Sequence, residues 1–260
     1  MRSIQARLSI AETAARNAGE VLADFYTRRG SIDIEMKGPN DFVSVADRQA
    51  ELCILNTIAE HFPNDRFIGE ETGVSGTPDG EFQWCIDPLD GTTNFLKGAH
   101  NWCVSIGLLL AGHPVAGVVY DPVRQEMFEG GVGLGARCNG MALRVSGEAD
   151  PARSTIGIGH VSRIPVGVFC GDTASLLGAG FSFRQVGAGA LMLAYVAAGR
   201  IDAYFERHMW PWDAVAGLAL IGSAGGRFLP YIGSEVGKGG MVLAANEALM
   251  RKAMAVLHVE

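Results

Sequence analysis

The sequence predicts a layered fold in which helices and β-sheets alternate, with an α+β first part and an α/β second part. Three observations support this prediction: the chain opens with an amphipathic helical pattern, continues with short apolar runs separated by turn residues, and ends with strands that alternate with helices. About half of the 260 residues are apolar. That is enough to bury a substantial core, as one large domain or as two small lobes.

Two helices with a short strand between them are expected at the start of the chain. Apolar residues recur on one helical face over residues 4–28, and the Arg-Gly pair at 29–30 is a suitable stop. Residues 31–36 alternate as a short strand does, and residues 37–41 have the composition of a turn. A second helix is expected over residues 44–59, because Ser44 precedes apolar positions at helical spacing.

Strands dominate the region that follows. Short apolar runs at 66–68 and 82–86 lie on either side of a Gly/Ser/Pro-rich loop at 72–80. Residues 104–110 and 115–120 flank an Ala-Gly-His-Pro turn, which predicts a β-hairpin. Because further strand-like pieces continue to about residue 145, the first part should form a large antiparallel sheet.

Strands and helices alternate in the second part of the chain. The stretch from 159 to 180 has no clear pattern. The expected elements are strands near 154–158, 181–186 and 201–205 and helices near 189–198 and 213–224.

The best candidate for a boundary between lobes is the polar segment at 146–153, Ser-Gly-Glu-Ala-Asp-Pro-Ala-Arg. We therefore expect an N-terminal α+β lobe over residues 1–146 and a C-terminal α/β lobe over residues 147–260. A site shared by the two would lie where they meet.

Charge and composition argue against a nucleic-acid-binding, membrane or zinc protein. The net charge is −7 without any stripe of Lys or Arg, so a nucleic acid is a poor main partner. No charge-free apolar run reaches about 18 residues, and residues 3–29 lack the pattern of a signal peptide. The five cysteines form no C-x-x-C pair and the six histidines show no zinc-binding spacing. We expect reduced, buried thiols in a cytoplasmic protein.

The densest chemical signal is Asp-Pro-Leu-Asp-Gly-Thr-Thr-Asn-Phe at 87–95, directly after the apolar strand predicted at 82–86. Two carboxylates three residues apart at a strand end are costly to bury without partners, because like charges repel and lose hydration. The alternative is ordinary turn chemistry, since Asp-Pro and Asp-Gly are common turn pairs. The segment alone leaves both interpretations open.

Three other acidic positions have simple structural explanations when each is taken alone. Glu70-Glu71 is typical of a solvated charge pair, Asp47 completes a capping box with Ser44, and Asp213 is a suitable helix N-cap. Together with Asp87 and Asp90, however, these carboxylates supply what hard cations such as Mg²⁺ require. Two such ions can clamp a phosphate, and the backbone N–H groups of residues 91–93 would cradle it at a helix N-terminus.

These motifs together resemble the inositol monophosphatase family of lithium-sensitive, Mg²⁺-dependent phosphatases. The resemblance rests on Glu70-Glu71, the string at 87–95 and Trp-Asp-Ala-Val-Ala-Gly at 212–217, and it extends to residues 43–47 and 202–206. It spans nearly the whole chain and implies five alternating α/β/α/β/α layers. It also implies a phosphomonoesterase that acts on inositol 1-phosphate or a similar polyol phosphate, and a homodimer.

The resemblance also implies a set of ligands for two to three Mg²⁺ ions. Glu70, Asp87 and the backbone carbonyl of Leu89 would hold the first ion. Asp87, Asp90 and Asp213 would hold the second, and Glu70 would help to hold a weaker third. Most of these ligands belong to the expected N-terminal lobe, whereas Asp213 belongs to the C-terminal one.

Catalytic and substrate-binding roles follow from the same resemblance. Thr92, through its hydroxyl and Asp47, would orient and deprotonate an attacking water, with Glu70 as a further catalytic group. No phospho-enzyme intermediate is implied, so water attacks the phosphate directly. Glu206 would reach hydroxyl groups of the substrate alcohol. The implied substrate contacts are Asp90, Gly91, Thr92, Glu206 and Asp213.

The sequence departs from the family pattern where the alcohol would bind. Ala188 and Gly189 stand where inositol-type members often carry Thr and then Ala, and residues 207–212 are unusually aromatic. Histidinol phosphate is therefore the alternative substrate, and fructose 1,6-bisphosphate and 3′-phosphoadenosine 5′-phosphate are acted on elsewhere in the superfamily. A silent fold kept for binding or regulation is a third hypothesis. Against it, all the carboxylates named above are present.

Overall fold

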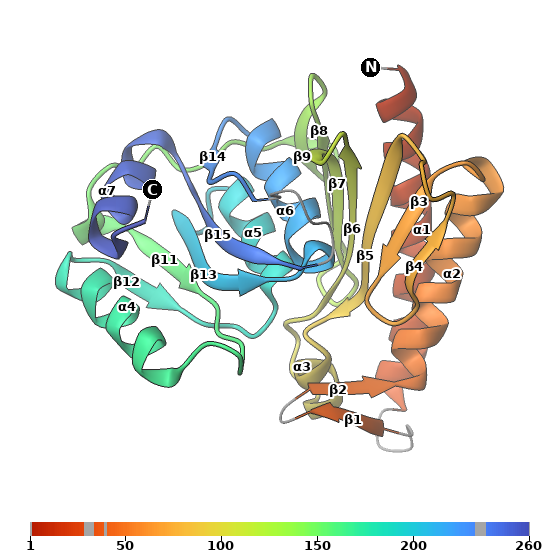
Figure 1. The fold of residues 1–260 in the computed structure, drawn as a ribbon, viewed down its shortest axis with the longest axis horizontal. Helices are drawn as coiled ribbons and strands as arrows, with labels where there is room; N and C mark the ends of the chain where they lie inside the picture. Colours follow the sequence, from red (N-terminus) through yellow and green to blue (C-terminus); the bar gives the residue numbers. More distant parts are fainter. Residues whose placement is uncertain (1, 29–33, 39–40, 232–237, 260) are drawn as a thin grey trace.

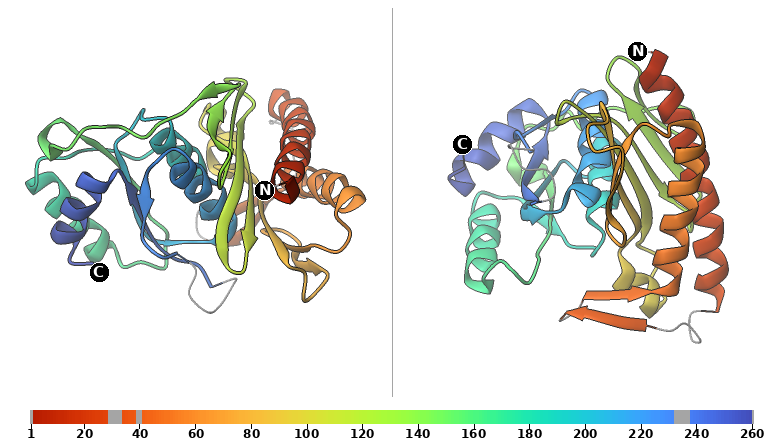
Figure 2. Two further views of the ribbon diagram at one scale, coloured as in Figure 1. Left: turned by 90° about the horizontal axis from the view of Figure 1, so that it is seen from above. Right: turned by 45° about the vertical axis from the view of Figure 1, so that its right-hand side comes forward.

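The computed structural model describes residues 2–28, 34–38, 41–231 and 238–259. These residues form five layers in which helices and sheets alternate (Figure 1), which confirms the predicted α/β/α/β/α arrangement. The first layer is a pair of neighbouring helices, α1 (Arg2–Thr27) and α2 (Val45–His61). Seen from above, these helices lie along one face of the first sheet (Figure 2).

The second layer is an eight-stranded sheet of order β10-β9-β8-β7-β6-β5-β3-β4. Its pairs are antiparallel except β3 with β5, which run parallel. The strands β6 and β7 are the predicted hairpin. The eight strands of this sheet are β3 (Arg66–Gly69), β4 (Gly73–Gly76), β5 (Phe82–Asp90), β6 (Cys103–Leu110), β7 (His113–Asp121), β8 (Glu126–Gly131), β9 (Gly135–Cys138) and β10 (Met141–Ala142).

Two helices fill the middle layer and a five-stranded sheet forms the fourth. The middle helices are α5 (Gly189–Ala197) and α6 (Pro211–Ser223). The second sheet has the order β12-β11-β13-β15-β14, in which β11 runs parallel to both of its neighbours. Its strands are β11 (Thr155–Ile158), β12 (Ser182–Arg184), β13 (Ala203–Met209), β14 (Arg227–Phe228) and β15 (Gly240–Ala245).

The outer face of the second sheet is covered by α4 (Val166–Gly178) and α7 (Glu247–Leu257), which form the fifth layer (Figure 1). The remaining elements are a two-stranded ribbon, β1 (Ile34–Gly38) with β2 (Asp41–Ser44), the short helix α3 (Thr92–Lys97), and a 3₁₀ turn, η2 (Pro151–Arg153). That turn lies in the segment that connects the two sheets.

Apolar side chains fill the spaces between the layers. On α1, buried residues such as Leu8, Ala15 and Leu22 recur at helical spacing and face the first sheet. The helix α2 begins with the capping box expected from the sequence: the Ser44 N–H donates to Asp47 at 2.9 Å, and the Ser44 hydroxyl accepts from Ala46 N–H. Local sequence therefore sets where α2 starts.

The structure contains elements that the sequence did not reveal. The loop expected at 72–80 contains strand β4, and the stretch without a clear pattern before residue 180 contains α4. The elements β14, β15 and α7, which lie beyond residue 224, were not identified from the sequence. The turn signals at 29–30 and 39–40 lie outside the described residues. All five cysteines are free, as expected, but Cys170 is exposed and Cys53 only half-buried.

Within the part of the chain that the structure describes, no helix has both the length and the apolar character needed to cross a membrane.

Candidate functional site

The site begins where β3 ends beside β5. These strands run parallel with Gly69 opposite Ile86, so Glu70 and Asp87 follow at the same sheet edge. The Glu70 N–H donates to the Ile86 carbonyl at 3.1 Å, which continues the ladder by one bond. The carboxyl ends of parallel strands collect functional side chains in many α/β folds. Parallel pairing thus brings together two acidic residues that lie 17 positions apart in the chain.

The helix α6 brings Asp213 to the same place from the second half of the chain. It crosses β6 and β7 at two glycines: a Cβ at Gly107 would lie 2.7 Å from Ala216 N, and one at Gly117 would lie 2.3 Å from Ala216 O. The Ser105 hydroxyl donates to the Trp212 carbonyl at 2.8 Å and fixes the start of the helix.

The helix starts earlier than residue 213, where the sequence placed it. Trp210 is the N-cap and Pro211 the first helical residue, so Asp213 lies inside the first turn. Asp213 is therefore not the N-cap that a purely structural explanation required. Its carboxylate lines a pocket together with Glu70, Asp87 and Asp90.

These four carboxylates perturb one another strongly. Burial raises the pKa of Asp87 well above its usual range, and the negative charges of Glu70, Asp213 and Asp90 raise it further. Burial and the charges of Asp90 and Glu70 act in the same way on Asp213. Asp87 also forms side-chain hydrogen bonds with Glu70 and Asp213. Without a cation, such a group must hold protons or repel itself.

The donor set fits Mg²⁺. The carboxylates line a pocket of about 450 Å³ that also reaches Leu89, Gly91 and Thr92. Among the described residues, no three His, Cys, Asp or Glu side chains form a ready-made cage for an ion. Mg²⁺ needs no such cage, because it keeps several waters and is held by few carboxylates plus substrate phosphate. Four mutually repelling oxygen-donor side chains around one pocket therefore indicate a cation more strongly than the lack of a ready-made cage among the described residues argues against one.

Asp90 has a second set of partners. Its carboxylate accepts N–H groups of Gly189 at 3.1 Å, Ala190 at 2.8 Å and Leu191 at 3.3 Å, at the start of α5. Burial raises the pKa of Asp90, and these hydrogen bonds oppose that shift. The Cys103 thiol, also buried, lies 3.6 Å from the same carboxylate. Through these hydrogen bonds, Asp90 connects the cluster of four carboxylates to α5 in the middle layer of the fold.

Thr92 lines the same pocket, and Asp47 lies next to it. The Thr92 hydroxyl is 3.2 Å from Asp47 Oδ1 and 3.0 Å from the Leu89 carbonyl. Asp47 is buried, which raises its pKa, and hydrogen bonds from Ser44 and Thr92 oppose that shift. Gly91, with φ of 93°, begins α3 in a conformation that other residues rarely adopt. The structure therefore brings together the predicted proton acceptor, its hydroxyl relay and the predicted phosphate cradle.

Glu51 is a site-supporting residue that was not identified from the sequence. It lies one turn after Asp47 on α2, is fully buried, and accepts the Glu71 N–H at 3.1 Å. A hydrogen bond from Thr72 also reaches its side chain. Within the described residues its Oε2 has no hydrogen-bond partner. The i, i+4 spacing from Asp47 is the signal that could have found it.

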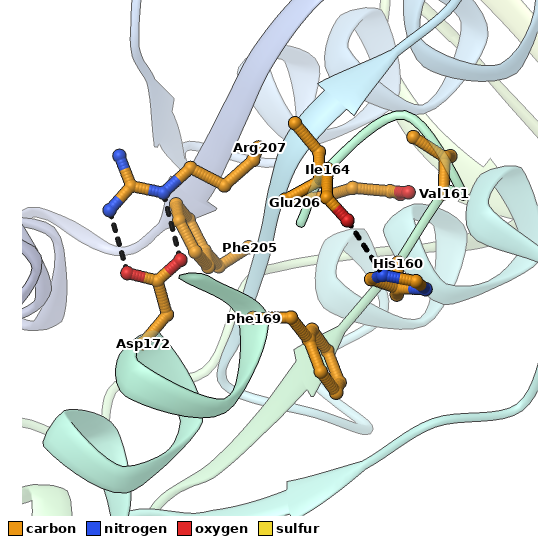
Figure 3. A pocket seen from close by; sticks show the side chains of 9 residues that line it. His160, Val161, Ile164, Phe169, Asp172, Phe205, Glu206 and Arg207 are labelled. Carbon is orange, nitrogen blue, oxygen red and sulfur yellow. Dashed lines mark hydrogen bonds and ion pairs between the residues drawn. The ribbon is translucent and has the colours of Figure 1, made fainter. Parts of the chain in front are cut away.

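Glu206 lies beside the main pocket rather than in its wall. It lines a small neighbouring pocket with His160 and Val161, and these two residues also line the main pocket. Its carboxylate accepts the Tyr204 hydroxyl at 2.7 Å, and burial raises its pKa to about 7. Figure 3 shows Glu206 directed toward the 160–161 segment, away from its neighbour Arg207. The predicted substrate contact is therefore adjacent to the carboxylate cluster, and its negative charge raises the pKa of Asp213.

The whole chain matches known proteins. A model of the inositol monophosphatase family matches residues 4–259. A relative from Pasteurella multocida named Nus factor SuhB is 40% identical over 243 residues, covering 92% of this chain and 91% of its own. An inositol-1-monophosphatase from Mesorhizobium japonicum is 38% identical over 250 residues, covering 95% and 94%.

Solved structures of similar proteins have the same fold. The extragenic suppressor protein suhB from Bartonella henselae superposes with a TM-score of 0.91 at 34% identity, over 97% of this chain and 98% of that one. An inositol monophosphatase from Anabaena superposes with a TM-score of 0.86 at 36% identity, over 98% and 96%. The layered fold is therefore shared along nearly the full length of the chain.

Proposed function

The chain belongs to the inositol monophosphatase family, and from that premise we propose that it is a Mg²⁺-dependent phosphomonoesterase acting on a small phosphorylated alcohol. The observation that supports this most is the cluster of four mutually repelling carboxylates at one pocket. A protein with no use for a cation would be destabilised by such a cluster. Inositol 1-phosphate or a similar polyol phosphate is the proposed substrate.

Each ligand role is part of this proposal. Glu70, Asp87 and the Leu89 carbonyl would hold one Mg²⁺, and Asp87, Asp90 and Asp213 a second, with Glu70 contributing to a third. Bound Mg²⁺ would neutralise phosphate charge and lower the pKa of water. These residues lie on β5, just after β3, and in the first turn of α6, which supports a role that depends on fixed positions.

The chain's own residues then orient the substrate and accept protons. The N–H groups of Gly91 and Thr92 would donate to phosphate oxygens. A water oxygen attacks phosphorus, the bond between phosphorus and the alcohol oxygen breaks, and the alcohol leaves with a proton. The Thr92 hydroxyl, 3.2 Å from Asp47, is placed to pass a water proton to that carboxylate. Because burial raises the pKa of Asp47, it is a better proton acceptor than an exposed aspartate.

The direct test is phosphate release from a panel of phosphomonoesters, with Mg²⁺ and with a chelator. The panel holds inositol 1-phosphate, histidinol phosphate, fructose 1,6-bisphosphate and 3′-phosphoadenosine 5′-phosphate. We expect Mg²⁺-dependent turnover that falls at least about 10²-fold in Asp87→Asn, while Asp24→Asn, an exposed carboxylate on α1, leaves it unchanged. A preference for histidinol phosphate would establish the alternative substrate. No turnover of any member would contradict the proposal.

Further properties follow as proposals from family membership: lobes 1–146 and 147–260 that meet at the pocket, a homodimer, a cytoplasmic location and inhibition by lithium. A second candidate function comes from the relatives named Nus factor, at 37–40% identity. In this second candidate function, the chain would act in transcription. If Asp87→Asn abolished catalysis while such a role persisted in cells, the two functions would be separable.

A further inference from the structure

A stack of three side chains forms another part of the pocket wall. The Arg163 guanidinium carbon lies 4.3 Å from the centroid of the Trp210 ring. Trp210 in turn stacks on Trp212, with centroids 5.0 Å apart and planes 16° from parallel. All three residues line the same pocket as the carboxylate cluster. The stack therefore places a cation at the rim of an acidic site.

Within the described part of the chain, Arg163 has no acidic partner, unlike Arg207 in the neighbouring small pocket. Arg207 forms a bidentate ion pair with Asp172 on α4, at 2.8 and 2.6 Å (Figure 3). Among the described residues, no carboxylate lies within ion-pair distance of Arg163, although four belong to the same pocket. Stacking on an aromatic face holds a guanidinium in place while its N–H donors stay available. The positive charge of Arg163 is thus oriented but not neutralised.

His208 adds no competing charge. Its ring lies edge-on to Trp210, with centroids 5.0 Å apart, and its Nε2 is 3.0 Å from the Lys238 carbonyl. Burial lowers the pKa of His208, and the charge of Arg163 lowers it further, so the imidazole is neutral near pH 7. The ring therefore supports Trp210 by packing, and Arg163 is the group of the stack that can attract an anion.

The position of Arg163 in the chain separates it from the phosphate cradle. Gly91 and Thr92 follow β5 of the first sheet, whereas Arg163 lies in the segment after β11 of the second. With about 450 Å³, the pocket has room for a phosphate and a further group. In the proposed function, metal ions and backbone N–H groups already serve the scissile phosphate. A guanidinium on a different segment is then suited to another part of the substrate.

We propose that Arg163, held on Trp210, binds a second anionic group, a carboxylate or a second phosphate, on the alcohol part of the substrate. This inference rests on the proposed function and extends its substrate class to phosphorylated alcohols that carry another negative charge. Guanidinium groups bind such planar or tetrahedral anions through paired N–H donors. The stack with Trp212 links this specificity element to the first turn of α6, beside Asp213.

The test uses two substrates that differ in one group. 2-Phosphoglycerate carries a carboxylate where glycerol 2-phosphate carries a hydroxymethyl group. We expect the wild-type protein with Mg²⁺ to prefer 2-phosphoglycerate. In Arg163→Gln the ratio of the two kcat/KM values should fall about 10- to 100-fold, the effect of one charge-assisted hydrogen bond, through KM rather than kcat. Arg163→Lys, which keeps the charge but loses the stack, should restore part of the ratio.

The control is Arg251→Gln, which removes an exposed arginine paired with Glu247 on α7 and should leave the ratio unchanged. If Arg163→Gln lowered kcat/KM equally for both substrates, Arg163 would act on the scissile phosphate and the inference would be overturned. If kcat/KM changed for neither substrate, the inference would be overturned as well. Calorimetric binding of both compounds in Mg²⁺ provides a second readout. If neither compound were hydrolysed, the proposed function would still be decided by the phosphomonoester panel, and tighter binding of 2-phosphoglycerate that is lost in Arg163→Gln would still support the anion site.

Discussion

The contact between α6 and the first sheet offers the sharpest test of how the site is assembled. Gly117 on β7 faces the backbone of Ala216: a Cβ there would lie 2.3 Å from the carbonyl oxygen, 2.6 Å from Cα and 2.7 Å from the carbonyl carbon. Real Cβ atoms essentially never come within 3.0 Å of such neighbours. Since all three atoms are backbone, Gly117→Ala must push α6 away by more than about half an ångström.

Two effects of Gly117→Ala follow. Overpacking of this kind costs about 1–3 kcal/mol, and each kcal/mol lowers the Tm of a protein of this size by about 2–4 °C. Asp213 lies one turn before Ala216 on α6 and moves with it. Because a displacement near 1 Å costs about 10²-fold in catalysis, we expect a higher Mg²⁺ concentration for half-maximal activity and a lower kcat.

Thermal unfolding and a Mg²⁺ titration of phosphate release measure both effects. The matched control is Gly171→Ala on α4, where an added Cβ meets nothing within 4 Å. There the substitution should stabilise the helix by about 0.5–1 kcal/mol and leave activity alone. If Gly117→Ala melted like the wild-type protein and kept its Mg²⁺ dependence, the close approach of α6 would not be what positions Asp213.

Three further predictions concern buried polar groups. Glu51→Ala removes the side chain that accepts the Glu71 N–H and should raise the Mg²⁺ concentration needed for activity. Glu51→Gln keeps an acceptor and should keep most of the activity. Equal effects of the two substitutions would contradict this. Glu206 has a pKa of about 7 in the folded protein, against 4.5 when exposed. Between these two pH values the folded protein holds a proton on Glu206 that the unfolded chain releases. The free energy of unfolding therefore falls as pH rises from about 4.5 to 7. Glu206→Gln should remove up to about 3 kcal/mol of that decline, measured by urea unfolding in a chelator at pH 5 and 8; an unchanged decline would rule this out. Arg7→Ala leaves Asp65 buried without its bidentate partner and should cost about 3–5 kcal/mol, whereas Arg28→Ala breaks an exposed pair and should cost under about 1 kcal/mol; similar losses in denaturant unfolding would count against this reasoning.

Local chemistry made much of the molecule predictable. The capping box at Ser44 was visible in four residues, because a helix start is decided by hydrogen bonds within one turn. The hairpin of β6 and β7 followed from two apolar runs around a short turn. The family and the layered fold followed from strings such as the one at 87–95, whose spacing is specific. The acidic residue types themselves indicated a cation, since only oxygen-rich groups suit Mg²⁺.

Other features were invisible because they depend on long-range packing. The helix α4 contains Gly167 and Gly171, which weaken its local signal, and it is held by its contact with α7. Pairing of β3 with β5 places Glu70 beside Asp87, and the glycines under α6 place Asp213 there. The support by Glu51 and the stacking of Arg163 on Trp210 likewise join distant segments.

The sequence by itself therefore determined the acidic residue types, the ends of several elements and the family. Tertiary structure alone decided which carboxylates share a pocket and which arginine, within the described residues, lines that pocket without an ion-pair partner. The physical reason is range: propensities, caps and turns act over a few residues, whereas burial, charge repulsion and stacking act between whatever surfaces the layers bring together.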